Sequence, residues 1–356
     1  MLRRSIVLLQ QGIRFAAARS LPRLPRRTIR TVAAFVMLLC CFLPATVSSQ
    51  HLSSQHLYVF GDSLSDTGNV FHELGRPPRP YVDGRFSNGP VWVDRLADQL
   101  HLTLTLITSI AAEETADSIN FAFGGATTGV DQDLGDRLGL QQQVRLFGDK
   151  LGGRSADPNA VYLVWAGAND YLSGRSIAAD QPIANLRSAI EALIADGARH
   201  IVVGNLPRLG QLPATRNRDT AAALDRLTIN HNQQVQALVA EFGQRDGMEM
   251  RLLDVNRLFE RAIAGEFNFT NVTEPCLDLQ AGTICSNPER YLFWDGIHPT
   301  TAAHQRISEA ALPLSMAISA ASESDRQATP SSLGIVAFVF GSLVVIAIAL
   351  RGKKRR

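Results

Sequence analysis

Acidic residues are missing from both ends of this chain. The 356-residue sequence has no Asp or Glu before Asp62 or after Asp325. Eight of its 35 Lys and Arg residues lie in residues 1–30 and five in residues 351–356, which leaves 22 basic against 33 acidic residues between them. Such an acidic body repels phosphate backbones, so we expect no nucleic-acid partner. Charged residues make up only 19% and hydrophobic residues 46%, which excludes a disordered, collagen-like or mainly coiled-coil chain.

Cysteine is also scarce. Two of the four cysteines, Cys40 and Cys41, lie in an N-terminal apolar stretch, so Cys276 and Cys285 are the only pair in the body of the chain. A disulfide between these two would suit an oxidising compartment, and two buried free thiols are the alternative. The histidines show no metal-ligand spacing, so we expect no metal site.

Residues 1–49 have the layout of a secretory signal peptide. Arginine-rich residues precede the apolar stretch 32–44, and small and polar residues follow it up to a cleavage site expected near Ser49. One alternative is an uncleaved N-terminal anchor, although the apolar stretch is short for a membrane span. The other is twin-arginine export, for which Arg26-Arg27 is a weak signal.

The C-terminal end predicts a membrane anchor. Residues 333–350 are 18 positions without a charge, enough at about 1.5 Å per residue to cross the hydrocarbon core of a bilayer. We expect a transmembrane helix there, preceded by a linker over 319–332 and followed by a basic cytoplasmic tail over 351–356. The tail resembles bacterial sorting signals, although Thr329-Pro330 stands where those signals have Pro-Glu-Pro. The body, residues 50–318, would then be exported and held outside the cytoplasm, in the periplasm or at the cell surface.

Within the body, two hydrophobic periods alternate. Short apolar runs typical of buried strands alternate with segments whose apolar residues recur every three or four positions, as in helices. This alternation predicts an α/β fold: a three-layer α/β/α, flavodoxin-like domain around a parallel sheet of about five strands. The expected strands are 57–60, 119–123, 161–165, 201–203 and 250–253.

Polar and small residues follow three of these strands directly. Ser63 comes after the first, Gly124 and Gly125 after the second, and Asn169 after the third. Because the carboxyl ends of parallel strands lie at one edge of a sheet, a nucleophile, a close backbone approach and an amide donor would meet there.

Asp295 and His298, three positions apart on a loop that Pro299 ends, complete a possible catalytic set. The carboxylate would orient the imidazole and stabilise its protonated form while His298 removes the proton of Ser63. No Gly-x-Ser-x-Gly motif is present, which argues against the nucleophile elbow of α/β-hydrolases.

Five segments resemble, in order, the motif blocks of the GDSL or SGNH hydrolase family, in the branch of plant GDSL lipases and bacterial thermolabile-hemolysin-like or cholesterol-acyltransferase-like lipases. The resemblance implies an SGNH hydrolase fold with Ser63 as nucleophile, His298 as general base and Asp295 as its partner. It also implies an oxyanion hole formed by the amides of Ser63 and Gly125 and the side chain of Asn169, and no cofactor. The choice of Gly125 over Gly124 depends on alignment. The five segments are FGDSLSDTGN (60–69), RFSNGPVWVDRLA (85–97), INFAFGGATTG (119–129), VWAGANDYL (164–172) and FWDGIHPT (293–300).

The sequence thus predicts an exported, monomeric esterase or lipase that cleaves carboxylic or lipid esters through an acyl-serine intermediate. Acyl transfer by the same machinery and a non-catalytic surface binding module on the same fold are the alternatives.

Four other polar residues have structural interpretations. Asp62 and Asp66 are expected to organise the serine loop through backbone amides. Asn88 is expected to cap a helix that starts just after it. His231 is expected to be a core histidine, because it lies on the apolar stripe of a helix.

Overall fold

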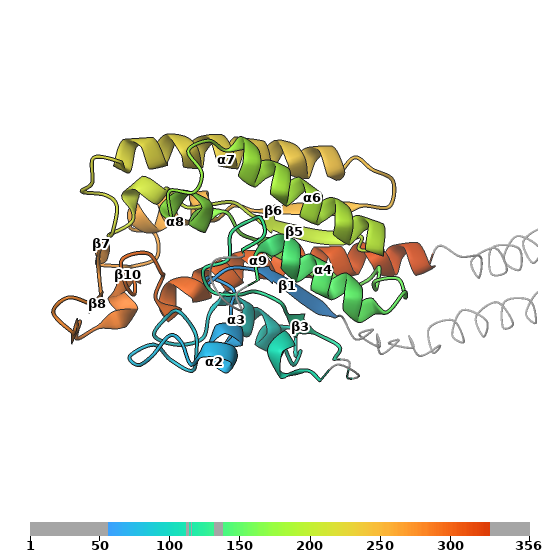
Figure 1. The fold of residues 1–356 in the computed structure, drawn as a ribbon, viewed down its shortest axis with the longest axis horizontal. Helices are drawn as coiled ribbons and strands as arrows, with labels where there is room; N and C mark the ends of the chain where they lie inside the picture. Colours follow the sequence, from blue (N-terminus) through green and yellow to red (C-terminus); the bar gives the residue numbers. More distant parts are fainter. Residues whose placement is uncertain (1–55, 112–113, 115, 132–137, 328–356) are drawn as a thin grey trace, which may run out of the picture. The chain divides into compact units, whose positions relative to one another are not determined.

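Short apolar segments form one parallel sheet of six strands (Figure 1). The computed structural model describes residues 56–111, 114, 116–131 and 138–327. The chain divides into two units, Met1–Leu52 and Ser53–Arg356, and every described residue belongs to the second. The strand order is β2-β3-β1-β4-β5-β6, with β1 (Leu57–Gly61), β2 (Thr105–Leu106), β3 (Ile119–Asn120), β4 (Val161–Trp165), β5 (His200–Gly204) and β6 (Glu249–Leu253).

The sheet has six strands where the sequence predicts about five. β1, β3, β4, β5 and β6 are the strands that the apolar runs predict, in the flavodoxin-like order. The sixth, β2, pairs with β3 at the edge of the sheet, and both of its side chains are only half-buried. An edge strand of this kind has no continuous apolar run, so the criterion used for the other five misses it.

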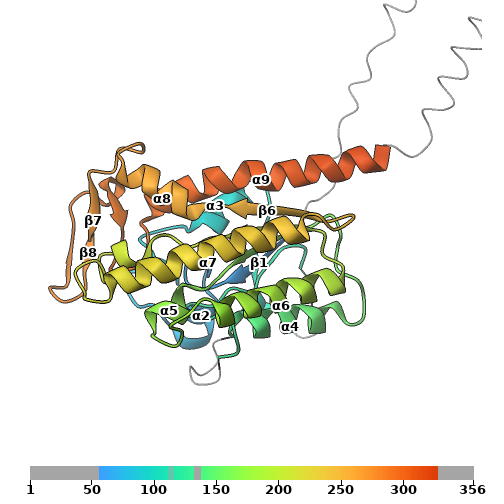
Figure 2. The ribbon, with the colours of Figure 1, turned by 90° about the horizontal axis from the view of Figure 1, so that it is seen from above.

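Helices cover both faces of the sheet, which confirms the three layers (Figure 2). One apolar core holds side chains of α4 (Leu140–Leu151), α6 (Asp180–Asp196) and α7 (Ala221–Phe242). The other core holds side chains of α3 (Trp92–Gln99), α8 (Val255–Ile263) and α9 (Thr301–Gln327). The shorter elements are α2 (Asn69–Leu74), α5 (Ala168–Leu172), β7 (Asn271–Pro275), β8 (Leu277–Asp278), β9 (Thr283–Ile284), β10 (Tyr291–Phe293) and the 3-10 turns Ile107–Ser109, Leu209–Gln211 and Pro288–Arg290.

The two cores follow from the periodicities of the sequence. Alternate residues of β4 point to opposite faces, so Tyr162 lies in the core under α4 and α6 while Leu163 lies in the core under α3 and α9. Along α6, Leu186, Ile190 and Leu193 are buried on one stripe, as their spacing predicts.

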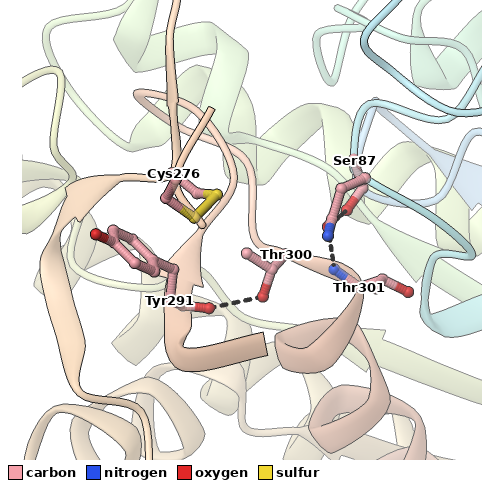
Figure 3. Close-up of a disulfide and its surroundings, with 7 residues drawn as sticks. Ser87, Cys276, Tyr291, Thr300 and Thr301 are labelled. Atoms are coloured by element: carbon pink, nitrogen blue, oxygen red, sulfur yellow. Dashed lines mark hydrogen bonds between the residues drawn. A yellow bond between two sulfur atoms is a disulfide. The ribbon is translucent and has the colours of Figure 1, made fainter. Parts of the chain in front are cut away.

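Two small sheets lie next to the start of α9. β10 pairs with β7 in parallel, and β8 and β9 form an antiparallel hairpin. A disulfide joins Cys276 and Cys285 across this hairpin (Figure 3). The Thr300 hydroxyl donates to the Tyr291 carbonyl at 2.7 Å, which fastens the last residue before α9 to β10 (Figure 3).

The predicted targeting segments lie mostly outside the described residues. This holds for the signal peptide (1–49), the transmembrane helix (333–350) and the basic tail (351–356). Among the residues that the structure describes, no helix combines the length and apolarity that a membrane span requires. α9 continues to Gln327, into the segment 319–332 predicted as a linker, because no glycine or proline interrupts that sequence before Pro330.

Candidate active site

The serine loop follows β1 and is held by two buried carboxylates. Ser63 itself is only 8% exposed. Oδ1 of Asp62 accepts the Leu64 amide at 3.0 Å. Asp66 accepts four backbone amides, three from the following turn and the fourth from Gly124 at 2.8 Å. The expected structural role of these aspartates therefore agrees with their contacts, and Asp66 also ties the serine loop to the loop after β3.

Ser63, His298 and Asp295 form a continuous chain of hydrogen bonds. Nε2 of His298 lies 2.9 Å from Oγ of Ser63, and Nδ1 lies 2.7 Å from Oδ2 of Asp295. Oδ1 of Asp295 accepts the backbone amides of Ile297 and His298 at 2.8 and 2.7 Å. An ionised carboxylate can only accept, so Nδ1 carries the proton and Nε2 is left to accept the serine proton.

The electrostatics keep Asp295 ionised beside His298. Burial alone would raise the pKa of Asp295, but the charge of His298 and the hydrogen bonds from His298 and Tyr81 lower it to about 2. Burial lowers the pKa of His298, but the charge of Asp295 and its hydrogen bond outweigh burial and raise this pKa above its ordinary 6.5. His298 is therefore a stronger base than a free histidine.

Of the residues predicted for an oxyanion hole, Asn169 lines the same cavity as Ser63. Among the described residues, none accepts a hydrogen bond from the backbone N–H of Ser63 or of Gly125. The N–H of Gly124, in contrast, donates to Asp66, and a Cβ at this glycine would lie 2.3 Å from the Phe86 ring. This geometry favours Gly125 over Gly124 as the donor. Nδ2 of Asn169 donates to the Ala126 carbonyl at 3.0 Å and to Oδ2 of Asp62 at 3.5 Å, which holds its amide between this loop and the serine loop.

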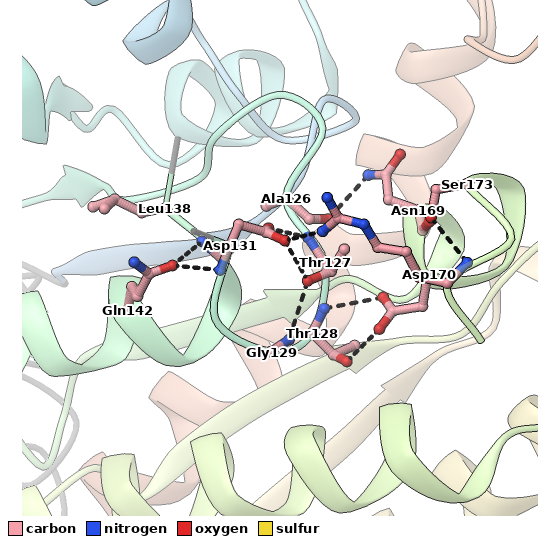
Figure 4. Close-up of polar contacts among 12 residues, drawn as sticks. Ala126, Thr127, Thr128, Gly129, Asp131, Leu138, Gln142, Asn169, Asp170 and Ser173 are labelled. Carbon is pink, nitrogen blue, oxygen red and sulfur yellow. Dashed lines mark hydrogen bonds and ion pairs between the residues drawn. The ribbon is translucent and has the colours of Figure 1, made fainter. Parts of the chain in front are cut away.

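A polar network fixes the loop after β3 against α5 (Figure 4). Oδ2 of Asp170 accepts the Thr128 amide at 3.0 Å, and Oδ1 accepts the Thr128 hydroxyl at 2.7 Å. Asp131 binds the amide and hydroxyl of Thr127 and pairs with Arg175 at 2.7 Å. Asp170 follows Asn169 directly. These hydrogen bonds therefore fix the position of Asn169 relative to the loop that contains Gly125.

The serine opens into a small, largely apolar cavity of about 30 Å³. It contains the Ser63 and His298 side chains and is lined on its other sides by Asp62, Leu64, Ala168, Asn169, Leu172, Pro207, Leu209, Leu212 and Ile297. Within the described part of the chain, no group of three His, Cys, Asp or Glu side chains is arranged to hold a metal ion.

His231 lies away from this cavity. It is fully buried in α7 with Nδ1 2.9 Å from the Tyr171 hydroxyl, as expected of a core histidine.

Two aromatic contacts to the site are not predicted from the sequence. The Tyr81 hydroxyl donates to Oδ2 of Asp295 at 2.6 Å, and the Phe86 ring lies 5.4 Å from the His298 ring, centre to centre. Both residues lie on the proline-rich loop before α3, where no periodicity indicates what a side chain faces.

Asn88 caps a different helix from the one expected. Asn88 accepts the amide of Thr301 at 2.8 Å and so caps α9 rather than α3, which follows it in the chain. The two loops pack side by side, and the first amides of α9 have no acceptor within their own helix.

Comparison with known proteins agrees with this geometry. Residues 57–311 match the family described as GDSL-like lipase/acylhydrolase. The chain belongs to this family.

Its relatives in the family include the phosphatidylcholine-sterol acyltransferase of Aeromonas hydrophila, which is 28% identical over 72% of this chain and 88% of the relative. A GDSL esterase/lipase of Arabidopsis thaliana is 26% identical over 78% of this chain and 94% of the relative. Among solved structures, a member of the lipolytic G-D-S-L family from Veillonella parvula aligns over 73% of this chain and 97% of its own, with 17% identity and a TM-score of 0.42.

Proposed function

We propose that this GDSL-family protein hydrolyses carboxylic esters through an acyl-serine intermediate. The observation that carries the proposal is the pair of short contacts from His298, 2.9 Å to the Ser63 hydroxyl and 2.7 Å to the Asp295 carboxylate. A serine hydroxyl is a weak nucleophile by itself, and a base within hydrogen-bond reach makes it competent for attack.

In the first half of the reaction, Oγ of Ser63 attacks the carbonyl carbon while Nε2 of His298 takes its proton. The negative charge that develops on the carbonyl oxygen is stabilised by the amides of Ser63 and Gly125 and by Asn169. The ester C–O bond then breaks, and His298 returns the proton to the leaving alkoxide. In the second half, water attacks the acyl-serine with the same help from His298, releases the acid and restores Ser63.

We further propose that the catalytic unit works outside the cytoplasm and is tethered by the C-terminal apolar segment. The signal-like segment 1–49 and the uncharged stretch 333–350 support this proposal. The disulfide between Cys276 and Cys285 adds support, since such bonds persist in oxidising compartments.

Acyl transfer to an alcohol is the second candidate, favoured by the similarity to the Aeromonas hydrophila acyltransferase. It requires only that an alcohol replace water in the second half of the reaction. Product analysis with and without added sterol or glycerol separates the two: ester products that depend on the added alcohol would favour transfer.

The hydrolytic proposal is tested with Ser63→Ala. We expect the variant to fold but to lose turnover of a short p-nitrophenyl ester and labelling by a fluorophosphonate probe, since both need the serine oxygen. Ser188→Ala, which removes an exposed hydroxyl of α6 bonded only to its own helix, is the matched control and should keep both. Undiminished turnover in Ser63→Ala would exclude Ser63 from the chemistry. Absence of labelling in the unaltered protein would favour a binding module.

A further inference from the structure

The loop of residues 81–88 packs along the loop that carries Asp295 and His298. Four residues of segment 81–88 each bind a residue of segment 295–301. Tyr81 bonds to Asp295, Phe86 packs on His298, Ser87 donates to the Pro299 carbonyl at 2.9 Å, and Asn88 accepts the amide of Thr301 at 2.8 Å.

Tyr81 completes the set of donors around the Asp295 carboxylate. Oδ1 is occupied by two backbone amides, and Oδ2 accepts both Nδ1 of His298 at 2.7 Å and the Tyr81 hydroxyl at 2.6 Å. The side chain of Asp295 is only 4% exposed, so water contributes little to its solvation. The Tyr81 ring is itself placed edge-on against Trp294, with centres 6.4 Å apart.

Phe86 restrains the imidazole of His298. Its ring lies over the imidazole of His298, and Gly124 leaves the room that this ring needs, since a Cβ there would approach it to 2.3 Å. The position of the Phe86 ring therefore explains why position 124 requires a glycine.

We propose that Tyr81 is a positioning residue, which acts through the Asp295 carboxylate to set the orientation and basicity of His298. The proposal rests on the proposed ester hydrolysis. Tyr81 does not line the cavity at Ser63, so its effect on turnover must pass through the carboxylate.

The direction of the effect follows from charge. The phenol shares the negative charge of Oδ2 with the imidazole, so its removal leaves more of that charge to stabilise protonated His298. The two backbone amides still hold Oδ1, so the carboxylate stays beside the imidazole, but Oδ2 loses one of the two hydrogen bonds that orient it. The other ionisable groups that influence His298 or are influenced by it are Asp62, from the serine loop, and His304, from α9, and neither contacts Tyr81.

Tyr81→Phe tests the proposal, because it deletes the hydroxyl and keeps the ring. In a pH profile of kcat/KM for a p-nitrophenyl ester, we expect the acid limb to move to higher pH by roughly half a pH unit. We also expect kcat on the plateau to fall roughly fivefold with little change in KM. Tyr162→Phe, which removes the hydroxyl that donates to the Asp157 carbonyl at 2.8 Å, is the control and should match the unaltered protein.

A double-mutant cycle identifies the route of the effect. In an Asp295→Asn background, Tyr81→Phe should cause no further shift of the acid limb, since the charge through which it acts is gone. An unmoved acid limb in the single variant, a shift to lower pH, or an equal effect in the Asp295→Asn background would each overturn the role of Tyr81. If the unaltered protein turned over no ester, the proposed function would fail instead. Thermal unfolding of each variant verifies that it is folded.

Discussion

At the scale of single residues, the site depends on side chains that do several things at once. Asp66 does not touch the cavity, yet its carboxylate binds the turn after Ser63 and the amide of Gly124 together. The Gly124 amide is occupied in this way, so of the two adjacent glycines only Gly125 is left as a candidate donor for the proposed oxyanion hole.

Asn169→Ala should lower kcat by roughly a hundredfold or more, because a missing oxyanion donor typically costs that much. The effect is measured with the same ester at saturating concentration. Asn159→Ala, on the loop before β4, removes an amide that bonds Asp157 and should leave kcat unchanged. Equal rates in the Asn169 variant and the unaltered protein would make Asn169 a turn residue only.

The residues that the sequence could predict are those with a local signal. Ser63, Asn169, Asp295 and His298 each lie in a short motif that places them at a strand end or on a turn. Tyr81 has no such signal, because its contact with Asp295 depends on how two loops far apart in the chain pack together. Tertiary packing of this kind leaves no period in the sequence.

At the scale of elements, the same distinction explains the missed strand. Residues 102–106 read Leu-Thr-Leu-Thr-Leu, a strict alternation typical of a half-buried strand, and β2 lies at its end. A search for apolar runs finds the other five strands and passes over β2, where leucine alternates with threonine. The helices were predictable from their stripes, whereas the cap of α9 by Asn88 again requires knowledge of the packing.

The disulfide hairpin supports the loop of Asp295 and His298. Backbone amides of Cys276 and Leu277 donate to the carbonyls of Phe293 and Trp294 at 3.1 and 2.6 Å, directly before Asp295. Replacing Cys276 and Cys285 by serine should lower the free energy of unfolding by about 2 to 3 kcal/mol, as expected for a bridge over nine positions. We also expect kcat to fall, since the loop loses its support.

Urea unfolding and ester turnover, each with and without a thiol reductant, check this prediction. The reductant should reproduce the effect in the unaltered protein and do nothing further to the double-serine variant. If the reductant left both the unfolding midpoint and kcat of the unaltered protein unchanged, the hairpin would not be supporting the site.

At the scale of the whole molecule, buried histidines limit stability in acid. Burial lowers the pKa of His231 to about 4, against 6.5 when unfolded. Between these values the unfolded chain binds a proton at His231 that the folded protein does not, so the contribution of His231 to stability falls as pH drops from 6.5 towards 4. We expect His231 alone to account for about 2 kcal/mol lost between pH 7 and pH 5.

His231→Gln should remove this share of the loss. Urea unfolding of both proteins at pH 7 and pH 5 measures this share. Burial raises the pKa of Asp62 to about 7 and that of Asp66 to about 6, so these two groups change the free energy of unfolding in the opposite direction. Their contributions are the same in both proteins and cancel in the comparison. An equal loss of stability in the variant and the unaltered protein would contradict the assignment.

α9 separates the loop of His298 from the C-terminal end of the described chain. It begins at Thr301, three positions after His298, and its 27 residues extend about 40 Å before the described chain ends. The proposed tether, residues 333–350, therefore follows the end of α9 that lies farthest from the loop of His298.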